Sequence, residues 1–289
     1  MKKYKTPLRY PGGKSRATKI LLEYIPERYC RYVEPFIGGG SMAIALQKAR
    51  PDLQITINDL YTPLYAFWMI LRDEGPKLSQ HLFQTKATLS DYESKDDVIK
   101  AHKDAFLLAK ERLNSDDISL YEMAYYFYIC NKCSFSGLSE SSSFSAQASQ
   151  SNFNESGINS LPYYHQLIRN WEIRNDDYQR VLDEEAAFNF LDPPYLIKDN
   201  LYGKKGDIHK AFDHQRMADF LNRDFQGMTM ITYNSSPEVE ALYPNWSKLQ
   251  WDLTYTMRST GTYGADQDKR KELLLVNYGI DNSNKQWYR

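Results

Sequence analysis

The segment Asp192–Tyr195, with the sequence Asp-Pro-Pro-Tyr, combines residue types that suit chemistry on an amino group. Two successive prolines lack amide hydrogens and have fixed φ angles, so the Asp192 carboxylate and the Pro193 carbonyl can converge on one NH2 donor. The Tyr195 ring could stack on the ring that carries this group. The alternative is an ordinary strand-ending turn. The predicted catalytic residues are Asp192, Pro193, Pro194 and Tyr195.

An apolar run directly precedes this segment and would position it. Residues Ala187 to Leu191 predict a short buried strand, which the two prolines must end. Asp192 would then lie at the carboxyl end of a strand, where open α/β sheets bind their ligands.

A glycine loop near the start of the chain suits a nucleoside. Gly38 and Gly40 follow a predicted strand over residues 29–36 and would let the backbone approach a ligand closely. Asp59 lies 21 positions after Gly38, at the end of the next predicted strand, and could accept hydrogen bonds from two ribose hydroxyls. This pattern fits a nicotinamide-dependent oxidoreductase, but that function would leave the Asp192–Tyr195 segment without a role. It equally fits a methyltransferase whose donor contains adenosine.

Gly13, Lys14 and Ser15 resemble the tail of a phosphate-binding P-loop. That loop requires a glycine at position 8, where this chain has Leu8, so a nucleotide hydrolase is not favoured. Lys14 could instead pair with the carboxylate of S-adenosylmethionine, and Tyr10 could form an aromatic wall beside it.

Length and composition limit the class of protein. The 289 residues suffice for one large α/β domain with an inserted module. No apolar stretch approaches the roughly 20 residues that cross a bilayer, and no apolar segment follows the basic start, so we expect a cytoplasmic protein without a signal peptide. Cys130 and Cys133 form a C-x-x-C pair that lacks a second pair or a nearby histidine, so no metal site is expected.

Basic residues are concentrated in a few segments although the net charge is −1. Residues 1–31 carry nine Lys or Arg against two Glu, a charge of +7 that leaves −8 for the remainder. Further clusters are Lys198, Lys204, Lys205 and Lys210, and residues 269–271. Such clusters can follow nucleic-acid phosphates, or they can be solvated surface charges.

The remaining pattern predicts alternating strands and helices interrupted by a helical segment. Before it we expect a helix over 15–27, a strand over 29–36, a helix over 41–47 and a strand over 53–57. Within it we expect three helices: one over 64–74 that Gly75 stops, one over 97–113, and one that begins at a capping box at Ser119 and runs to about residue 130. A loop over 134–157 should follow. After it we expect a strand over 187–191, a helix over 213–222, a strand over 227–233, a helix from Ser236 and a strand over 273–278. The two α/β portions should share one sheet.

Taken together, the motifs resemble those of the Dam-like DNA adenine N6-methyltransferases. The matching segments, in the order of that family, are residues 8–14, 34–41, 58–60, 131–137 and 192–195. The resemblance implies an α/β fold with a Rossmann-like methyltransferase sheet and an inserted, mostly helical target-recognition domain. The catalytic domain would comprise residues 1–60 and 161–289, and the DNA-binding insert residues 61–160.

The resemblance also implies the ligands and their contacts. The cofactor would be S-adenosylmethionine, and the substrate an adenine flipped out of double-stranded DNA; no membrane or obligatory protein partner is implied. The implied cofactor-binding residues are Tyr10, Lys14, Glu34, Phe36, Gly38, Gly40, Asp59, Asp177, Tyr178 and Asp192. Residues 258, 259, 271 and 272 resemble the family's C-terminal region without an assigned role. The serine-rich segment after Gly137 departs from the GATC-specific members and leaves the target sequence open.

Three alternative functions remain at this stage. They are a methyltransferase that acts on RNA or protein, a nicotinamide-dependent oxidoreductase, and a DNA-binding protein without catalytic activity.

Overall fold

The computed structural model describes residues 5–10, 12–15, 17–135, 137, 142–195, 212–252 and 271–280. In this part of the chain seven strands form one sheet in the order β3-β2-β1-β4-β5-β7-β6. The strands are β1 (Arg31–Glu34), β2 (Gln54–Asn58), β3 (Glu172–Arg174), β4 (Ala187–Leu191), β5 (Met228–Asn234), β6 (Ser247–Asp252) and β7 (Lys271–Val276).

The first five strands in this order pair in parallel, whereas β7 is antiparallel to both of its neighbours. The order 3-2-1-4-5 is that of a doubly wound sheet, which binds ligands where the strand order reverses. All five residues of β4 are buried, as expected for a central parallel strand. The predicted Rossmann-like α/β fold and the shared sheet are therefore confirmed.

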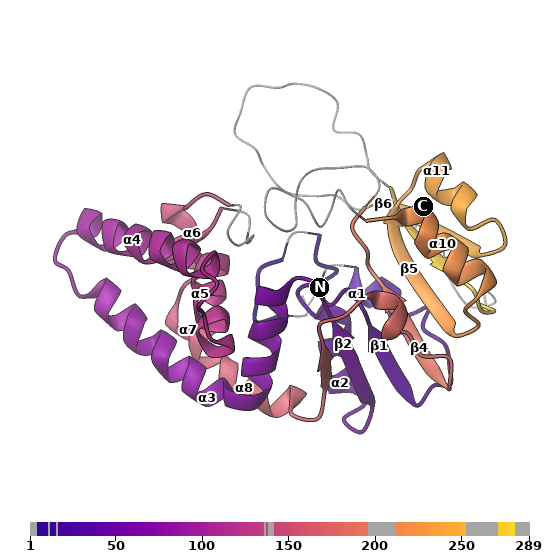
Figure 1. Cartoon of the computed structure of the whole chain (residues 1–289), viewed down its shortest axis with the longest axis horizontal. Helices are drawn as coiled ribbons and strands as arrows, with labels where there is room; N and C mark the ends of the chain where they lie inside the picture. Colours follow the sequence, from indigo (N-terminus) through magenta and orange to yellow (C-terminus); the bar gives the residue numbers. More distant parts are fainter. Residues whose placement is uncertain are drawn as a thin grey trace.

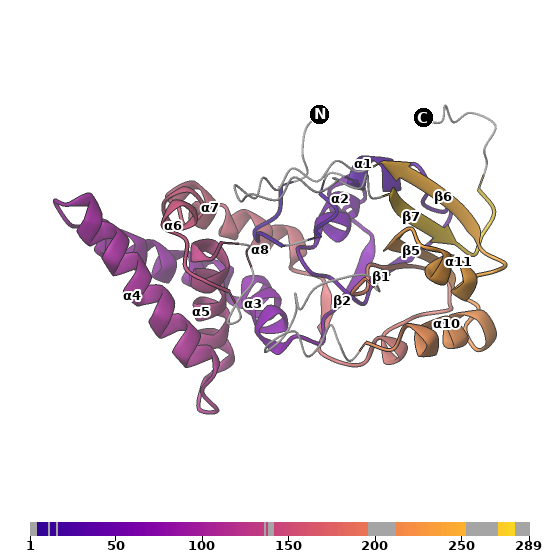
Figure 2. The same ribbon diagram turned by 90° about the horizontal axis from the view of Figure 1, so that it is seen from above.

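Helices cover both faces of the sheet (Figure 2). Helices α1 (Thr18–Leu21) and α2 (Ser41–Ala49) lie on one face, and α10 (His214–Arg223) and α11 (Pro237–Leu242) on the other. The two faces bury separate apolar clusters, because successive side chains of a strand point to opposite sides.

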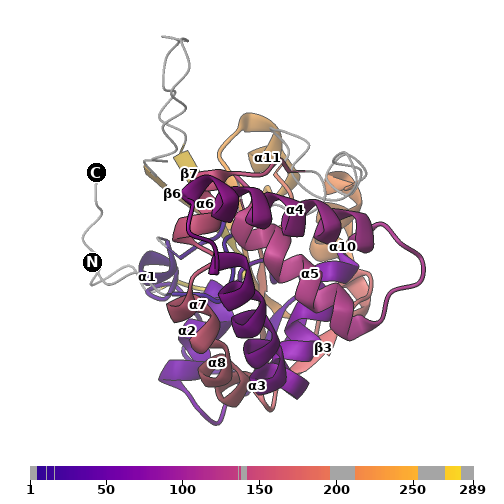
Figure 3. The ribbon, with the colours of Figure 1, turned by 90° about the vertical axis from the view of Figure 1, so that its left-hand side faces the viewer.

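A helical body extends from one side of the sheet (Figure 1). Its helices are α3 (Thr62–Ser90), α4 (Lys95–Leu113), α5 (Leu120–Cys133), α6 (Ala146–Ser151), α7 (Glu155–Asn159) and α8 (Leu161–Ile168). Helix α3 packs against α5 and α8, and α4 packs against α5 (Figure 3). Helix α8 also contacts α2, so it joins this body to the sheet. The predicted capping box at Ser119 is confirmed at the start of α5.

The predicted end of a helix at Gly75 is confirmed as a break between two helices. The range of α3 runs on to Ser90, but Glu74, two residues before Pro76, has non-helical φ and ψ of −130° and 26°, so two helices meet there at a kink. Proline is tolerated in the first turn of a helix, so the kink restarts the helix at the position where the pattern predicted its end. A β-carbon on Gly75 would lie 2.5 Å from Cβ of His165 in α8, so glycine here permits close helix packing.

Three further element predictions need correction. Helix α1 covers only Thr18–Leu21 rather than residues 15–27, because the amides of Glu23 and Tyr24 bond to carbonyls three residues earlier, which tightens the chain out of the α-helix. The predicted loop over 134–157 contains α6 and most of α7, because Ser145 and Asn154 act as N-caps. Strand β6 was not predicted, because Ser247, Lys248 and Gln250 are polar and exposed at the sheet edge and interrupt any apolar run.

Candidate functional site

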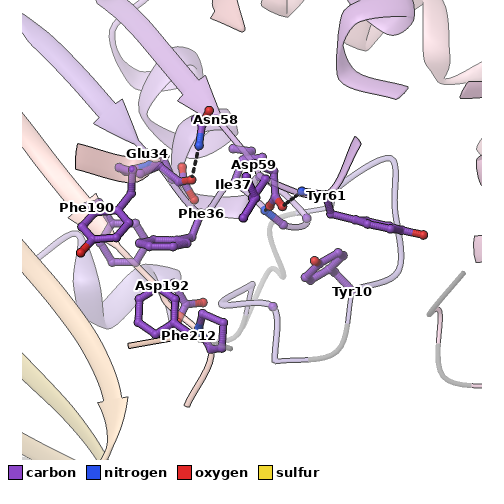
Figure 4. Close-up of a pocket in the computed structure, with 18 of the residues that line it drawn as sticks. Tyr10, Glu34, Phe36, Ile37, Asn58, Asp59, Tyr61, Phe190, Asp192 and Phe212 are labelled. Atoms are coloured by element: carbon purple, nitrogen blue, oxygen red, sulfur yellow. Dashed lines mark hydrogen bonds between the residues drawn. The ribbon is translucent and has the colours of Figure 1, made fainter. Parts of the chain in front are cut away.

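A cavity of about 420 Å³ lies at the carboxyl ends of β1, β2 and β4 (Figure 4). The structure brings all ten predicted cofactor-binding residues to its wall: Tyr10, Lys14, Glu34, Phe36, Gly38, Gly40, Asp59, Asp177, Tyr178 and Asp192. Pro194 also lines it, whereas Pro193 and Tyr195 follow the same turn without lining the cavity.

Asn58 ties together the strand ends that shape the cavity. Its side-chain amide donates to the carbonyl oxygens of Pro35 and Asp176, each at 3.0 Å, and its carbonyl oxygen accepts from the Asp176 amide at 2.8 Å. Asn58 is buried, so these bonds fix the ends of β1 and β3 relative to β2. The neighbouring Asp59 and Asp177 thereby face the same cavity.

The glycine loop after β1 requires glycine for conformation and for space. Gly38 and Gly40 have φ angles of 46° and 69°, in the left-handed region. A β-carbon on Gly38 would lie 2.8 Å from the Tyr10 ring, and one on Gly40 would lie 2.8 Å from Trp68. The indole of Trp68 also donates to the Gly38 carbonyl at 3.2 Å. The loop is thus packed between the N-terminal segment and α3.

Asp59 presents a carboxylate at the end of β2. It accepts from the backbone amides of Tyr61 at 3.1 Å and Gly38 at 3.3 Å. Burial raises the pKa of Asp59 to about 6, although these two amides act in the opposite direction. Figure 4 shows Asp59 with Tyr10 and Tyr61 on one side of the cavity, and Asp192 on the other.

Glu34 is a second carboxyl group, buried at the end of β1. One of its oxygens accepts from the Tyr32 hydroxyl at 2.8 Å and from the Ala43 amide at 3.0 Å. Burial raises the pKa of Glu34 to about 8, and the negative charge of Asp192 acts in the same direction. This shift favours the neutral form of Glu34, which reduces the negative charge beside Asp192.

Lys14 and Asp192 form an ion pair across the cavity wall. The Lys14 Nζ lies 2.7 Å from Oδ1 and 2.9 Å from Oδ2 of Asp192, and it also donates to the Gly12 carbonyl at 3.1 Å. The Thr232 hydroxyl donates to Oδ1 of Asp192 at 2.8 Å. Nζ further lies 4.8 Å from the centroid of the Tyr195 ring, so Lys14 links the cavity to the residue beyond the proline turn.

Aromatic rings form another part of the wall. The rings of Phe36, Tyr178 and Phe212 lie 5.6 to 6.0 Å apart by centroid, a typical spacing for aromatic contacts. Arg216 of α10 lies over the Tyr178 ring and pairs with Asp177 at 3.2 Å. These rings can enclose a planar base.

Sequence reasoning missed Asn58, Phe212 and Arg216 as site residues. The position of Asn58 directly before Asp59 at a strand end could have suggested a structural role. Phe212 and Arg216 carry no such local signal, since only the fold brings the start of α10 to the cavity.

The N-terminal segment is held by the helical body. The Asn131 side chain accepts from the Arg9 amide at 3.0 Å and donates to the Arg9 and Gly137 carbonyls, each at 2.6 Å. The Arg9 guanidinium donates to the carbonyls of Ser134 at 2.8 Å and Phe135 at 3.0 Å. Two of the sequence segments that resemble family motifs therefore lie in direct contact.

Several predicted features lie outside the described residues. They are the lysine cluster at 198, 204, 205 and 210, and residues 258, 259, 269 and 270. In the ranges that are described, no three His, Cys, Asp or Glu side chains gather as metal ligands would, and no helix has the length and apolar character of a membrane span.

Residues 10–257 match the family described as D12 class N6 adenine-specific DNA methyltransferases. The chain belongs to this family. It is therefore an enzyme that methylates adenine in DNA, and the resemblance inferred from the motifs is confirmed. Membership does not favour an RNA or protein methyltransferase, an oxidoreductase or a catalytically inactive DNA-binding protein. It also implies S-adenosylmethionine as the methyl donor.

Similar proteins agree with this membership. The chain is 25% identical to the Type II methyltransferase M1.LlaDCHI of Lactococcus lactis subsp. cremoris, over 94% of each chain. It is 23% identical to the Type II methyltransferase M.MjaIII of Methanocaldococcus jannaschii, over 94% of this chain and 98% of that one. A solved structure of the rRNA methyltransferase aviRa from Streptomyces viridochromogenes aligns with 92% of this chain and 87% of its own, at 14% identity and a TM-score of 0.31. A similarity at that TM-score says nothing about substrate or site.

Proposed function

We propose that the cavity binds S-adenosylmethionine and that Asp192, Pro193, Pro194 and Tyr195 receive the target adenine beside it. The observation that carries this proposal is the position of Asp192. Asp192 lines the cavity wall, and it is also the first residue of the proline turn that leads to Tyr195. One residue thus borders the sites of both substrates.

The cavity wall fits the parts of the donor. Asp59 can accept from ribose hydroxyls, and the rings of Phe36, Tyr178 and Phe212 can enclose the adenine base. Lys14 can pair with the donor carboxylate when it exchanges one of its present acceptors, Asp192 or the Gly12 carbonyl, for that contact. Bound S-adenosylmethionine supplies an electrophilic methyl group on its sulfonium. The cavity volume of about 420 Å³ lies within the usual range for such ligands.

The target adenine must leave the double helix to reach this site. Extruding a base costs a few kcal/mol, and stacking on Tyr195 recovers roughly 1–3 kcal/mol. The Asp192 carboxylate and the Pro193 carbonyl accept the two N6 hydrogens and direct the nitrogen lone pair toward the donor.

Positioning provides most of the rate enhancement in this mechanism. The N6 lone pair forms the new bond to the methyl carbon, and the electron pair of the breaking C–S bond remains on sulfur. The methylated nitrogen then loses one proton to water, which restores a neutral base. Asp192 holds N6 in line for this displacement, and no covalent enzyme intermediate is needed.

The two parts of the chain have separate roles in this proposal. Residues 1–60 and 161–289 form the catalytic domain, because both contribute strands to the one sheet, although α8 at the start of the second part packs with the helical body. Residues 61–160 form the target-recognition insert on duplex DNA. The bonds between Arg9 and Asn131 place this insert against the N-terminal segment that carries Tyr10 and Lys14.

The proposal is tested with the substitution Asp192→Ala and labelled S-adenosylmethionine. Sequencing methylated adenines in DNA from cells that express the chain first gives the target sequence. A duplex with that sequence should then gain label with the wild-type enzyme and not with Asp192→Ala. The matched control is Asp219→Ala, since Asp219 is a surface carboxylate of α10 paired with Arg223. Full activity of Asp192→Ala would refute the assignment.

A further inference from the structure

A hydrogen bond connects Tyr195 to a residue far along the chain. The Tyr195 hydroxyl donates to Oε2 of Glu272 at 2.9 Å, and Glu272 is only 1% exposed. We propose that Glu272 is a positioning residue for methyl transfer, because it holds the Tyr195 ring in the orientation that stacks on adenine. This inference rests on the proposed role of Tyr195.

Glu272 itself occupies a rigid position. It lies in β7, which pairs on both sides, so Glu272 is directly opposite Asn234 of β5 and Trp251 of β6. Backbone hydrogen bonds on two sides restrict the movement of its Cα atom. A hydrogen-bond acceptor on a strand inside a sheet moves less than one on a loop. The Glu272 carboxylate therefore restricts the movement of the Tyr195 phenol that it binds.

The residue type is unexpected for this strand unless the carboxylate has a partner. The four residues that follow, Leu273 to Val276, are apolar and fully buried. A buried carboxylate is costly unless it is hydrogen-bonded or paired, so an apolar residue would be the less costly choice in a purely structural strand. A phenol that donates to a carboxylate forms a charge-assisted hydrogen bond, which provides part of that compensation.

The bond restrains the ring at its far end. At the near end, the backbone of Tyr195 follows Pro193 and Pro194, whose φ angles are fixed. The ring also lies 5.9 Å by centroid from Tyr233 and 4.8 Å from the Lys14 ammonium. A ring restrained in this way loses little entropy when a base stacks on it. The adjacent carboxylate also makes the ring more electron-rich, which favours an adenine that becomes positively charged during transfer.

Three substitutions test the role of Glu272. Tyr195→Phe removes the donor and keeps the ring, Glu272→Leu removes the acceptor, and Glu272→Gln keeps a neutral acceptor. We expect single-turnover methylation to slow about 10- to 100-fold in Tyr195→Phe and in Glu272→Leu, as for a slightly misplaced reactant. Glu272→Gln should be intermediate. The double variant should be no slower than either single variant, because both remove one interaction.

Binding measurements separate positioning from a merely structural effect. The affinity for S-adenosylmethionine and the unfolding midpoint of Tyr195→Phe should remain close to wild type while its rate constant falls. The matched control is Tyr278→Phe, which removes a phenol hydrogen bond of the same 2.9 Å length, to the Tyr24 carbonyl. That control should methylate at the wild-type rate.

The possible failures are distinguishable. A wild-type rate in Tyr195→Phe, or slowing factors that multiply in the double variant, overturns the role of Glu272. If Glu272→Leu does not fold, Tyr195→Phe and Glu272→Gln still decide the question. A fully active Tyr195→Ala instead overturns the proposed role of Tyr195 itself.

Discussion

The Lys14 ammonium contacts both carboxylate oxygens of Asp192, although 178 residues separate the two along the chain. Lys14 is 5% exposed and Asp192 is 19% exposed, so water solvates this ion pair only partly. Lys14 and Asp192 therefore compensate each other's charge, and this pair joins the N-terminal glycine turn to the proline turn.

We expect Lys14→Met to destabilise the ligand-free protein by about 1–3 kcal/mol, because it leaves the Asp192 carboxylate without its partner. Adding Asp192→Asn should recover part of this loss, since the unpaired charge is then removed. Urea unfolding of the single and double variants measures both effects. A double variant less stable than Lys14→Met would contradict this account of the pair.

The affinity for S-adenosylmethionine should depend on the protonation of Asp59. Burial raises the pKa of Asp59 to about 6, so the carboxylate proposed to accept from the ribose is lost as the pH falls below this value. We expect affinity to fall by up to about tenfold per pH unit there. Calorimetric titration with S-adenosylmethionine at several pH values around 6 measures this change in affinity. Asp59→Asn should bind more weakly and lose this dependence; an equally steep dependence in that variant would assign it to another group.

Glu34 should make the free energy of unfolding decrease as the pH rises. Its pKa is raised from 4.5 to about 8, so the folded state keeps a proton that the unfolded state loses. The stabilisation is complete below about 4.5 and is lost as the pH rises through about 8. Urea unfolding at several pH values should show this decline in the wild type. The decline should be shallower in Glu34→Gln, and identical slopes would rule out Glu34 as its source.

Asn131→Ala should affect donor binding although Asn131 does not line the cavity. The substitution removes three hydrogen bonds of a fully buried side chain, and we expect a stability loss of about 1–3 kcal/mol. The backbone of Arg9 then loses both of its bonds to Asn131 and keeps only the guanidinium bonds to Ser134 and Phe135, so the neighbouring Tyr10 is held less firmly and the affinity for S-adenosylmethionine should also fall. Asn114→Ala is the control, because its exposed side chain bonds only the local Lys110 carbonyl. Unchanged donor affinity in well-folded Asn131→Ala would contradict the link.

Gly75→Ala should destabilise the protein even though alanine favours helix by about 1 kcal/mol. The new Cβ would lie 2.5 Å from Cβ of His165, and overpacking of this kind costs about 1–3 kcal/mol. Gly157→Ala in α7 is the matched control, since its nearest contact would be 3.4 Å, to a side-chain oxygen of Asn154. Thermal unfolding compares the two; a higher midpoint in Gly75→Ala would show that α3 and α8 separate easily.

Local patterns predicted much of the fold and of the cavity wall. The strand over 187–191 and its proline turn are specified by neighbouring residues, as are the glycine loop and the start of α2. The same holds for Asp59, because a period-2 apolar run places the following acid at a strand end.

The contacts that the sequence did not predict join distant segments. The bond between Tyr195 and Glu272, and the bonds from Asn58 to Asp176, depend on strand order and register, which no local pattern specifies. The second half of α3 shows the same limit. Gly75 and Pro76 marked the break at Glu74, but the helix that resumes after it and ends at Ser90 was not predicted.

Strand β7 lies inside the sheet although it comes last along the chain among the described strands. While the ribosome is still translating the segment before it, β5 lacks its antiparallel neighbour and β6 has no strand to pair with. Tyr195 then also lacks the Glu272 carboxylate. A nascent chain therefore forms the bond between Tyr195 and Glu272 only after β7 has emerged from the ribosome.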